Sequence, residues 1–268
     1  MKITVLGTRG SMPVAGKSFV LYGGATSCYK VQAGDEEIYL DAGSGIVEAM
    51  SSPTTRVTIL ITHMHLDHIL GLPFFSTLRE SGRPIDIYAG KRSGLLPHEA
   101  IDRLISPPFW PCKIENYPAH VNIHTLPELS RGNRTHFNIG AVEVDMMEGN
   151  HPGGSTIFRL TYAGKSLVYA TDFEHTPEDC AALTDFAKRT NLLLYDAQYT
   201  EDEYGRCRGY GHSTPAEGLK VAAAAEVGRL LFVHHAPNRT DEELLNMERE
   251  FAGRAVSFAK FGEEIFLR

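Results

Sequence analysis

The stretch THMHLDH, at residues 62–68, places four groups that can bind metal within six positions: His63, His65, Asp67 and His68. Imidazole and carboxylate groups are suitable ligands for zinc, manganese or iron. In an extended loop, residues two apart point the same way, so His63 and His65 can grip one ion. Asp67 and His68 can then turn towards a second ion. The spacing therefore predicts a metal site with room for two cations.

Further metal-capable groups follow other apolar runs. His151 comes after AVEVDMM, Asp172 ends VYATD, and His234 and His235 end LLFVHH. A carboxylate such as that of Asp172 has two oxygens and can bridge two ions. A lone histidine is more often structural than a ligand. A set of four candidate ligand residues directly after an apolar strand is rare by chance, which favours a metal site.

Short β-rich segments separated by glycine-containing turns must position these groups. We expect strands at residues 2–7, 28–33, 37–43, 57–61, 84–90, 141–147, 155–162, 166–172, 191–198 and 229–235, with β character over 255–267. Capping signals predict helices over 213–227 and 240–253. Apolar spacing predicts that a helix begins within 69–81. Residues 94–120 are expected to form a helix that leads into a surface loop carrying Phe109 and Trp110, because the prolines of 104–112 prevent regular structure.

Composition narrows the class of protein. The chain has 268 residues, is 43% hydrophobic and carries a net charge of -7. A protein that coats nucleic acid needs a basic face, so we expect no stable nucleic-acid partner. Four scattered cysteines, the lack of a signal core and the lack of a long apolar run predict a cytoplasmic protein without a membrane segment. No spacer divides the chain, so residues 1–268 are expected to form one domain.

With HxHxDH at residues 63–68, His151 in NHPGG, Asp172 in YATD and a late strand-end histidine, the chain resembles the metallo-β-lactamase superfamily. The resemblance implies an α/β fold, a four-layer αββα sandwich, with the site at one edge of two sheets. It also implies two divalent metal ions, with zinc expected and manganese or iron as alternatives. It assigns the first ion to His63, His65 and His151, the second to Asp67, His68 and the late histidine, and a bridging role to Asp172.

Two neighbouring histidines compete for the last ligand position. The phosphodiesterase and tRNase Z branch of the superfamily ends this strand as THxxP, which selects His234 when laid on VHHAP. His235 is the alternative, and its side chain should point to the opposite face of the strand. Asp41, in LDAGSG, is expected to hydrogen-bond to backbone near the metal loop and not to bind metal.

Three segments resemble that same branch. VLGTRGSMP is similar to its LGTGxxxP start, and LLLYDAQY to its LLxHEATF strand, with Asp196 in place of glutamate. GYGHSTPAEG is similar to its GHST segment. The resemblance places His212 near the metals, oriented by Asp196, as a donor to the leaving group. We therefore expect Asp67, His212 and Asp196 to be catalytic, although His212 could only shape the entry to its helix, and Asp196 is one methylene shorter than glutamate.

The function this favours is a dinuclear phosphodiesterase acting on a small cyclic nucleotide or cyclic ribose phosphate. Two cations about 3.5–4 Å apart can hold a bridging hydroxide that attacks phosphorus. A tRNA 3′-processing endonuclease, a lactonase or thioesterase, and a non-catalytic binding protein are the alternatives. No Gly/Pro-rich arm for gripping tRNA is apparent. Phe109 and Trp110 could stack on a base or simply pack their loop, and a homodimer is expected from the family.

Overall fold

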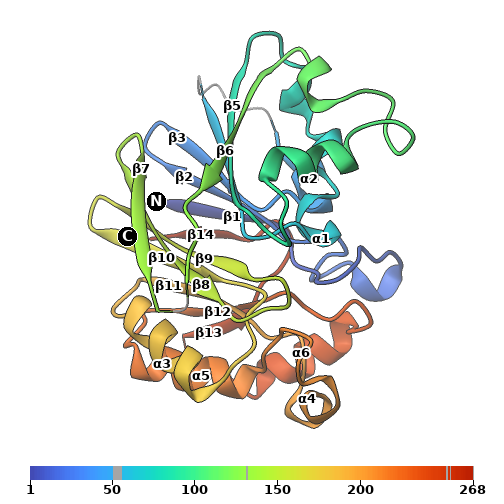
Figure 1. The fold of residues 1–268 in the computed structure, drawn as a ribbon. Helices are drawn as coiled ribbons and strands as arrows, with labels where there is room; N and C mark the ends of the chain where they lie inside the picture. The colour runs from blue at the N-terminus through green and yellow to red at the C-terminus, as the bar shows by residue number, and fades with distance from the viewer. Residues whose placement is uncertain (51–55, 131, 252, 254, 268) are drawn as a thin grey trace.

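Two seven-stranded sheets form the centre of the computed structural model, which describes residues 1–50, 56–130, 132–251, 253 and 255–267 (Figure 1). The first sheet has the order β14-β1-β2-β3-β4-β5-β6, with β1 (Lys2–Gly7), β2 (Cys28–Ala33), β3 (Glu36–Leu40), β4 (Val57–Ile61), β5 (Pro84–Gly90), β6 (His120–Leu126) and β14 (Glu264–Phe266). The second has the order β13-β12-β11-β10-β9-β8-β7, with β7 (Arg134–Ile139), β8 (Val142–Gly149), β9 (Ser155–Tyr162), β10 (Lys165–Ala170), β11 (Leu192–Asp196), β12 (Leu230–Val233) and β13 (Val256–Phe258).

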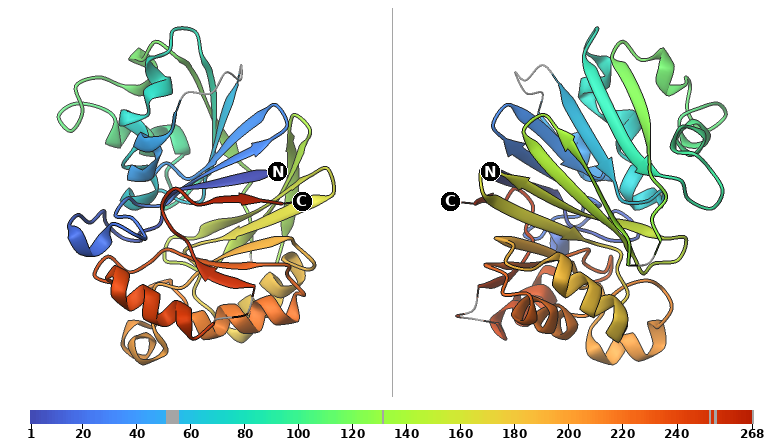
Figure 2. Two further views of the ribbon diagram at one scale, coloured as in Figure 1. Left: turned by 180° about the vertical axis from the view of Figure 1, so that it is seen from behind. Right: turned by 60° about the vertical axis from the view of Figure 1, so that its left-hand side comes forward.

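Helices cover the outer faces of both sheets. The α-helices are α1 (Leu66–Ile69), α2 (Pro97–Leu104), α3 (Pro177–Phe186), α4 (Glu201–Cys207), α5 (Pro215–Ala224) and α6 (Asp241–Arg249). Short 3-10 turns are η1 (Lys17–Phe19), η2 (Ser44–Glu48), η3 (Leu72–Phe74), η4 (Ser76–Arg79) and η5 (Ile114–Asn116). In the views of Figure 2, α3, α5 and α6 line the second sheet, while α2 lies on the far side of the first.

Three apolar clusters define the layers. One joins side chains of both sheets, such as Val31 with Phe158, and so lies between them. A second packs β4 and β5 against Leu72 and Ile101, and a third packs β11 and β12 against the helices that carry Leu183 and Val221. The order helix, sheet, sheet, helix confirms the predicted αββα sandwich. In the described part of the chain, no helix is long and apolar enough to cross a membrane.

The strand directions gather the candidate groups at one edge. Strands β3 to β6 run parallel to one another, as do β10 to β13. Strand β8 pairs antiparallel with β9, and β9 antiparallel with β10, so β8 runs in the same direction as β10. Carboxyl ends of parallel strands meet at one edge of a sheet, which is where α/β proteins place their sites.

Some elements differ from the expectation. Residues 69–81 form short turns and not one helix, because Pro73 interrupts helical hydrogen bonding and Gly71 packs against the backbone of Gly43. Strands β6 and β7 and helices α3 and α4 were not predicted. The acidic segment after Thr200 is helical because Thr200 and Glu203 form a capping box.

Candidate functional site

Strained backbone positions mark the strand ends at this edge. Asp41 directly follows β3, Asp172 lies two residues after β10, and His234 directly follows β12. All three adopt a left-handed conformation, with φ values of 61°, 51° and 61°. Such a conformation is uncommon for a residue other than glycine, and strained residues of this kind cluster at functional sites. Here it turns each side chain off its strand and towards the same centre.

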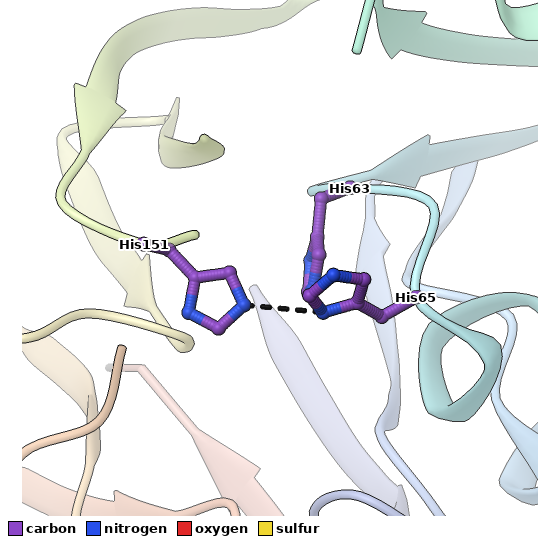
Figure 3. Close-up of side chains that lie close together, drawn as sticks. All are labelled: His63, His65 and His151. Carbon is purple, nitrogen blue, oxygen red and sulfur yellow. Dashed lines mark hydrogen bonds between the residues drawn. The ribbon is translucent and has the colours of Figure 1, made fainter. Parts of the chain in front are cut away.

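Three of the predicted ligands form a first cluster (Figure 3). His63 and His65 come from the loop after β4, and His151 comes from the loop after β8. Their ligand atoms lie within 4.8 Å of one another, and His151 Nε2 is 3.2 Å from His65 Nδ1. His151 Nδ1 donates to the carbonyl of Gly211, so Nε2 is the nitrogen left to face the cluster.

Four residues form a second cluster: Asp67, His68, Asp172 and His234, with ligand atoms within 4.8 Å of one another. All are buried. His234 Nε2 lies 3.1 Å from Asp67 Oδ2, and His68 Nε2 lies 3.3 Å from the same oxygen. The structure thus brings the HxHxDH segment together with two groups that are 104 or more residues away in the chain, Asp172 and His234.

Asp172 connects the two clusters. Its Oδ1 is 3.7 Å from Nε2 of both His63 and His151. Its Oδ2 is 3.1 Å from His68 Nε2 and 3.3 Å from His234 Nε2. One carboxylate therefore presents one oxygen to each cluster, which is the arrangement that a bridging ligand requires.

The charges of the two clusters differ. Burial opposes the charged form of His68, but Asp172, Asp67 and Asp41 raise the pKa of its imidazole well above the usual value. Burial opposes the charged form of His234 too, yet Asp172 and Asp67 raise its pKa to about 9. Burial and nearby His68 lower the pKa of His63 well below normal. The second cluster thus favours positive charge at its centre, while the first favours neutral imidazole, the form that binds metal.

Unsatisfied nitrogens agree with a metal-binding role. His63 Nε2 and His68 Nε2, the nitrogens that face Asp172, are buried and have no hydrogen-bond partner among the described residues. Buried polar atoms are normally paired, so orphaned ones call for an explanation. Divalent cations would satisfy such nitrogens and neutralise the clustered carboxylates, and the donor set of imidazole and carboxylate suits zinc, manganese or iron.

His212 and Asp196 lie beside the second cluster. Nδ1 of His212 donates to Oδ2 of Asp196 over 2.8 Å, and the imidazole stacks on that of His234 with centroids 4.8 Å apart. Asp196 also accepts from the backbone N–H groups of Asp172 and Gln198. The aspartate thus reaches the imidazole despite being one methylene shorter than glutamate.

The neighbouring His235 lies outside both clusters. Its Nε2 donates to the carbonyl of Ala259 over 2.9 Å, and its ring packs on Tyr22 and Phe258. Burial lowers the pKa of His235 to about 3. His234 faces the carboxylates of Asp67 and Asp172, while His235 packs against β13.

Asp41 has a larger role than the sequence indicated. It accepts from the backbone N–H of Thr62 over 2.8 Å, as expected of a residue that ties the metal loop. It also accepts from His68 Nδ1 over 2.7 Å and from the hydroxyl of Tyr169 over 2.8 Å. Asp41 therefore fixes the tautomer of His68 and leaves Nε2 facing Asp172.

Two further supports escaped the sequence reasoning. The loop after β1 brings the backbone N–H of Ser11 to Oδ2 of Asp67 at 2.7 Å. The carboxylate of buried Glu174 accepts from the backbone N–H groups of Gly209 and Gly211, so it holds the loop whose carbonyl orients His151. The LGTRGS segment is the sequence signal from which the first support could have been found, but nothing in the sequence pointed to Glu174.

Comparisons with known proteins agree with the observed fold. Residues 37–235 match the family model described as Beta-lactamase superfamily domain. A curated relative named Ribonuclease Z, from Myxococcus xanthus (strain DK1622), is 25% identical over 100% of this chain and 99% of its own length. Among solved structures, the short form of human tRNase Z superposes with a TM-score of 0.75 at 22% identity, covering all of both chains. A diphosphatase of the PhnP family gives 0.73 at 18% identity, over 100% of this chain and 98% of its own.

Proposed function

Because the chain belongs to the beta-lactamase superfamily and is a metal-dependent hydrolase, we propose that it is a phosphodiesterase with two divalent cations. Its substrate would be a small phosphodiester such as a cyclic nucleotide or a cyclic ribose phosphate. The observation that carries the proposal is the position of Asp172, whose two oxygens face two separate groups of imidazoles. A single-cation site would not need a second oxygen in that position.

The ligands divide into two sets on this proposal. His63, His65 and His151 would hold one cation, and Asp67, His68 and His234 the other, with Asp172 contacting both. Zinc suits this donor set best, and manganese or iron would also fit. Bound cations in such a site supply a Lewis acid for phosphate oxygens and lower the pKa of water.

The chain's own residues supply orientation and a proton. Asp196 holds Nδ1–H of His212, so Nε2 is the nitrogen that can give a proton to the leaving oxygen once the imidazole is charged. Ser11 N–H holds Asp67, and Asp41 holds His68, so neither has to reorganise when substrate binds. These contacts keep the reacting geometry fixed, which is the main contribution a protein makes to electrostatic catalysis.

A tRNA 3′-processing endonuclease is the second candidate, because the Myxococcus xanthus relative named Ribonuclease Z matches along its whole length. Two observations favour the small substrate. The alignment with that relative is longer than this chain, so the relative has segments for which this chain has no counterpart. The net charge of -7 also disfavours a large polyanion.

A hydrolysis screen on metal-reconstituted protein tests the proposal. The substrates are 2′,3′- and 3′,5′-cyclic nucleotides, bis-p-nitrophenyl phosphate, a precursor tRNA and a panel of lactones. Asp67→Ala is the test variant, and Asp35→Ala, in an exposed turn, is the matched control. We expect phosphodiester turnover in the wild type and the control and none in Asp67→Ala. Lactone turnover without phosphodiester cleavage would contradict the proposal, and tRNA cleavage alone would select the second candidate.

A further inference from the structure

A cavity of about 650 Å³ opens beside the first cluster and shares His63 and His65 with it. Its other walls are mostly apolar and include Met64, Leu66, Leu95, Leu104 and Phe109. Cavities that hold small molecules measure about 300–1,000 Å³ and are typically lined by apolar groups. The cavity is therefore large enough for a nucleoside-sized group, and a substrate bound at the imidazoles would extend into it.

Phe109 lines this cavity, and the neighbouring Trp110 anchors the loop that carries both residues. Trp110 packs edge-on against Phe74, with centroids 4.8 Å apart, and donates to the hydroxyl of Tyr117 over 2.8 Å. Phe109, one residue earlier, is 80% exposed, and Leu66, which also lines the cavity, is 61% exposed. Exposed apolar side chains that gather beside polar reactive groups mark a binding surface.

The two arginines that line the cavity differ in their hydrogen-bond partners. Arg92 is committed, because its guanidinium donates to Glu148 over 2.6 Å and to Thr156 over 2.8 Å. The guanidinium of Arg103, an exposed residue of α2, forms no hydrogen bond or ion pair with another residue in the described part of the chain. An unpaired guanidinium can stack on a flat π-system that enters the cavity.

We propose that this cavity binds an aromatic ring carried by the substrate, such as a nucleobase, with Phe109 as its stacking surface. The inference rests on the phosphodiesterase function proposed above. It assigns this cavity to the part of the substrate that does not react. A sugar or a short alkyl group would cover less of this apolar wall and could not stack on Phe109. Stacking of a base on an aromatic side chain typically changes affinity by about tenfold or more.

Binding tests the proposal without turnover. Titration calorimetry of the metal-loaded protein compares phenyl phosphate with methyl phosphate, which share the charged group and differ in the ring. We expect phenyl phosphate to bind about tenfold more tightly to the wild type, and this preference to vanish in Phe109→Ala. The control is Phe266→Ala, since Phe266 is 56% exposed on β14, which pairs with the start of β1 away from the site. The preference of Phe266→Ala for phenyl phosphate over methyl phosphate should equal that of the wild type.

Kinetics provides the second arm. The substrates are 2′,3′-cyclic AMP and glycerol 1,2-cyclic phosphate, which carry the same five-membered cyclic phosphodiester with and without a base. Phe109→Ala should lower kcat/KM about tenfold for the former and leave the latter unchanged. Turnover of both, with ring preference independent of Phe109, would overturn this inference and leave the phosphodiesterase function intact. A Phe109-dependent preference for phenyl phosphate without any phosphodiester turnover would overturn that function and leave the aromatic site intact.

Discussion

Asp196 accepts a hydrogen bond from Nδ1 of His212 over 2.8 Å, and both side chains are buried. Because a carboxylate only accepts, Nδ1 must carry the proton, and Nε2 is the nitrogen available for proton transfer. The pair lies against His234, so a proton given from Nε2 would go to a group bound beside the second cluster.

The first prediction concerns the leaving group. His212→Ala should lower kcat by about 10²–10⁴-fold for a cyclic nucleotide, whose alkoxide leaving group needs a proton. The same variant should lose far less on bis-p-nitrophenyl phosphate, because p-nitrophenolate leaves without protonation. Steady-state kinetics on both substrates gives the comparison. Equal losses on the two would show that His212 does not donate a proton.

The second prediction concerns Asp41. Since its carboxylate orients His68, Asp41→Asn should weaken metal binding about 10–100-fold, as is usual for partners behind a ligand. Competition with a chromophoric chelator measures the affinity. Asp86→Asn is the matched control, because Asp86 is also buried and accepts from His124 over 2.9 Å, outside both clusters. An equal metal affinity in Asp41→Asn and wild type would show that Asp41 does not support metal binding.

The third prediction concerns the close approach of Gly10 to His234. A Cβ at Gly10 would lie 2.3 Å from the imidazole of His234, so Gly10→Ala must displace that ring or the loop. We expect weaker binding of the second cation and at least tenfold lower activity. Gly205→Ala is the control, because a Cβ there meets nothing within 4 Å. Metal analysis together with kinetics decides, and wild-type values for Gly10→Ala would contradict this placement of His234.

The fourth prediction concerns pH and stability. Burial lowers the pKa of His235 from its usual 6.5 to about 3 in the folded protein. The unfolded chain therefore takes up a proton below pH 6.5 while the folded chain does not, so stability falls as pH drops from about 6.5 towards 3. Between pH 7 and 5 this group should cost about 2 kcal/mol.

Urea unfolding of chelator-treated protein at pH 7, 6 and 5 measures this loss. His235→Gln keeps a donor for the Ala259 carbonyl but cannot titrate, so its free energy of unfolding should fall less steeply. The other histidines contribute equally to both proteins. Parallel curves for wild type and variant would show that His235 does not contribute to the pH dependence.

Sequence reasoning reached the strand-end groups because each follows an apolar strand within a few residues. His63, Asp172 and His234 are of this kind, and their meeting follows from parallel strands sharing an edge. The contacts of Asp41 with His68 and Tyr169, and the role of Glu174, could not be predicted in this way. Asp41 bonds to Tyr169, 128 residues away, and Glu174 acts through backbone N–H groups more than 30 residues along the chain. Such contacts depend on how the layers pack, which no local pattern records.

Helix prediction failed where tertiary contacts override local preference. The apolar spacing of residues 69–81 is typical of a helix, but the close packing of Gly71 on Gly43 and the position of Pro73 divide the segment into turns. The surface loop of Phe109 and Trp110 was predicted from its prolines. The different environments of its two aromatic rings depend on Tyr117 and Phe74, which the sequence did not connect with them.

The proposed activity depends on two cations that act together across Asp172. Zinc is titrated into chelator-treated protein while bis-p-nitrophenyl phosphate hydrolysis and bound metal are followed in parallel. We predict that hydrolysis rises until two equivalents are bound per chain, and that Asp172→Ala shows no hydrolysis at the same metal concentrations. Full activity at one equivalent of zinc, or no phosphodiester hydrolysis at two, would contradict the proposal that two cations act together.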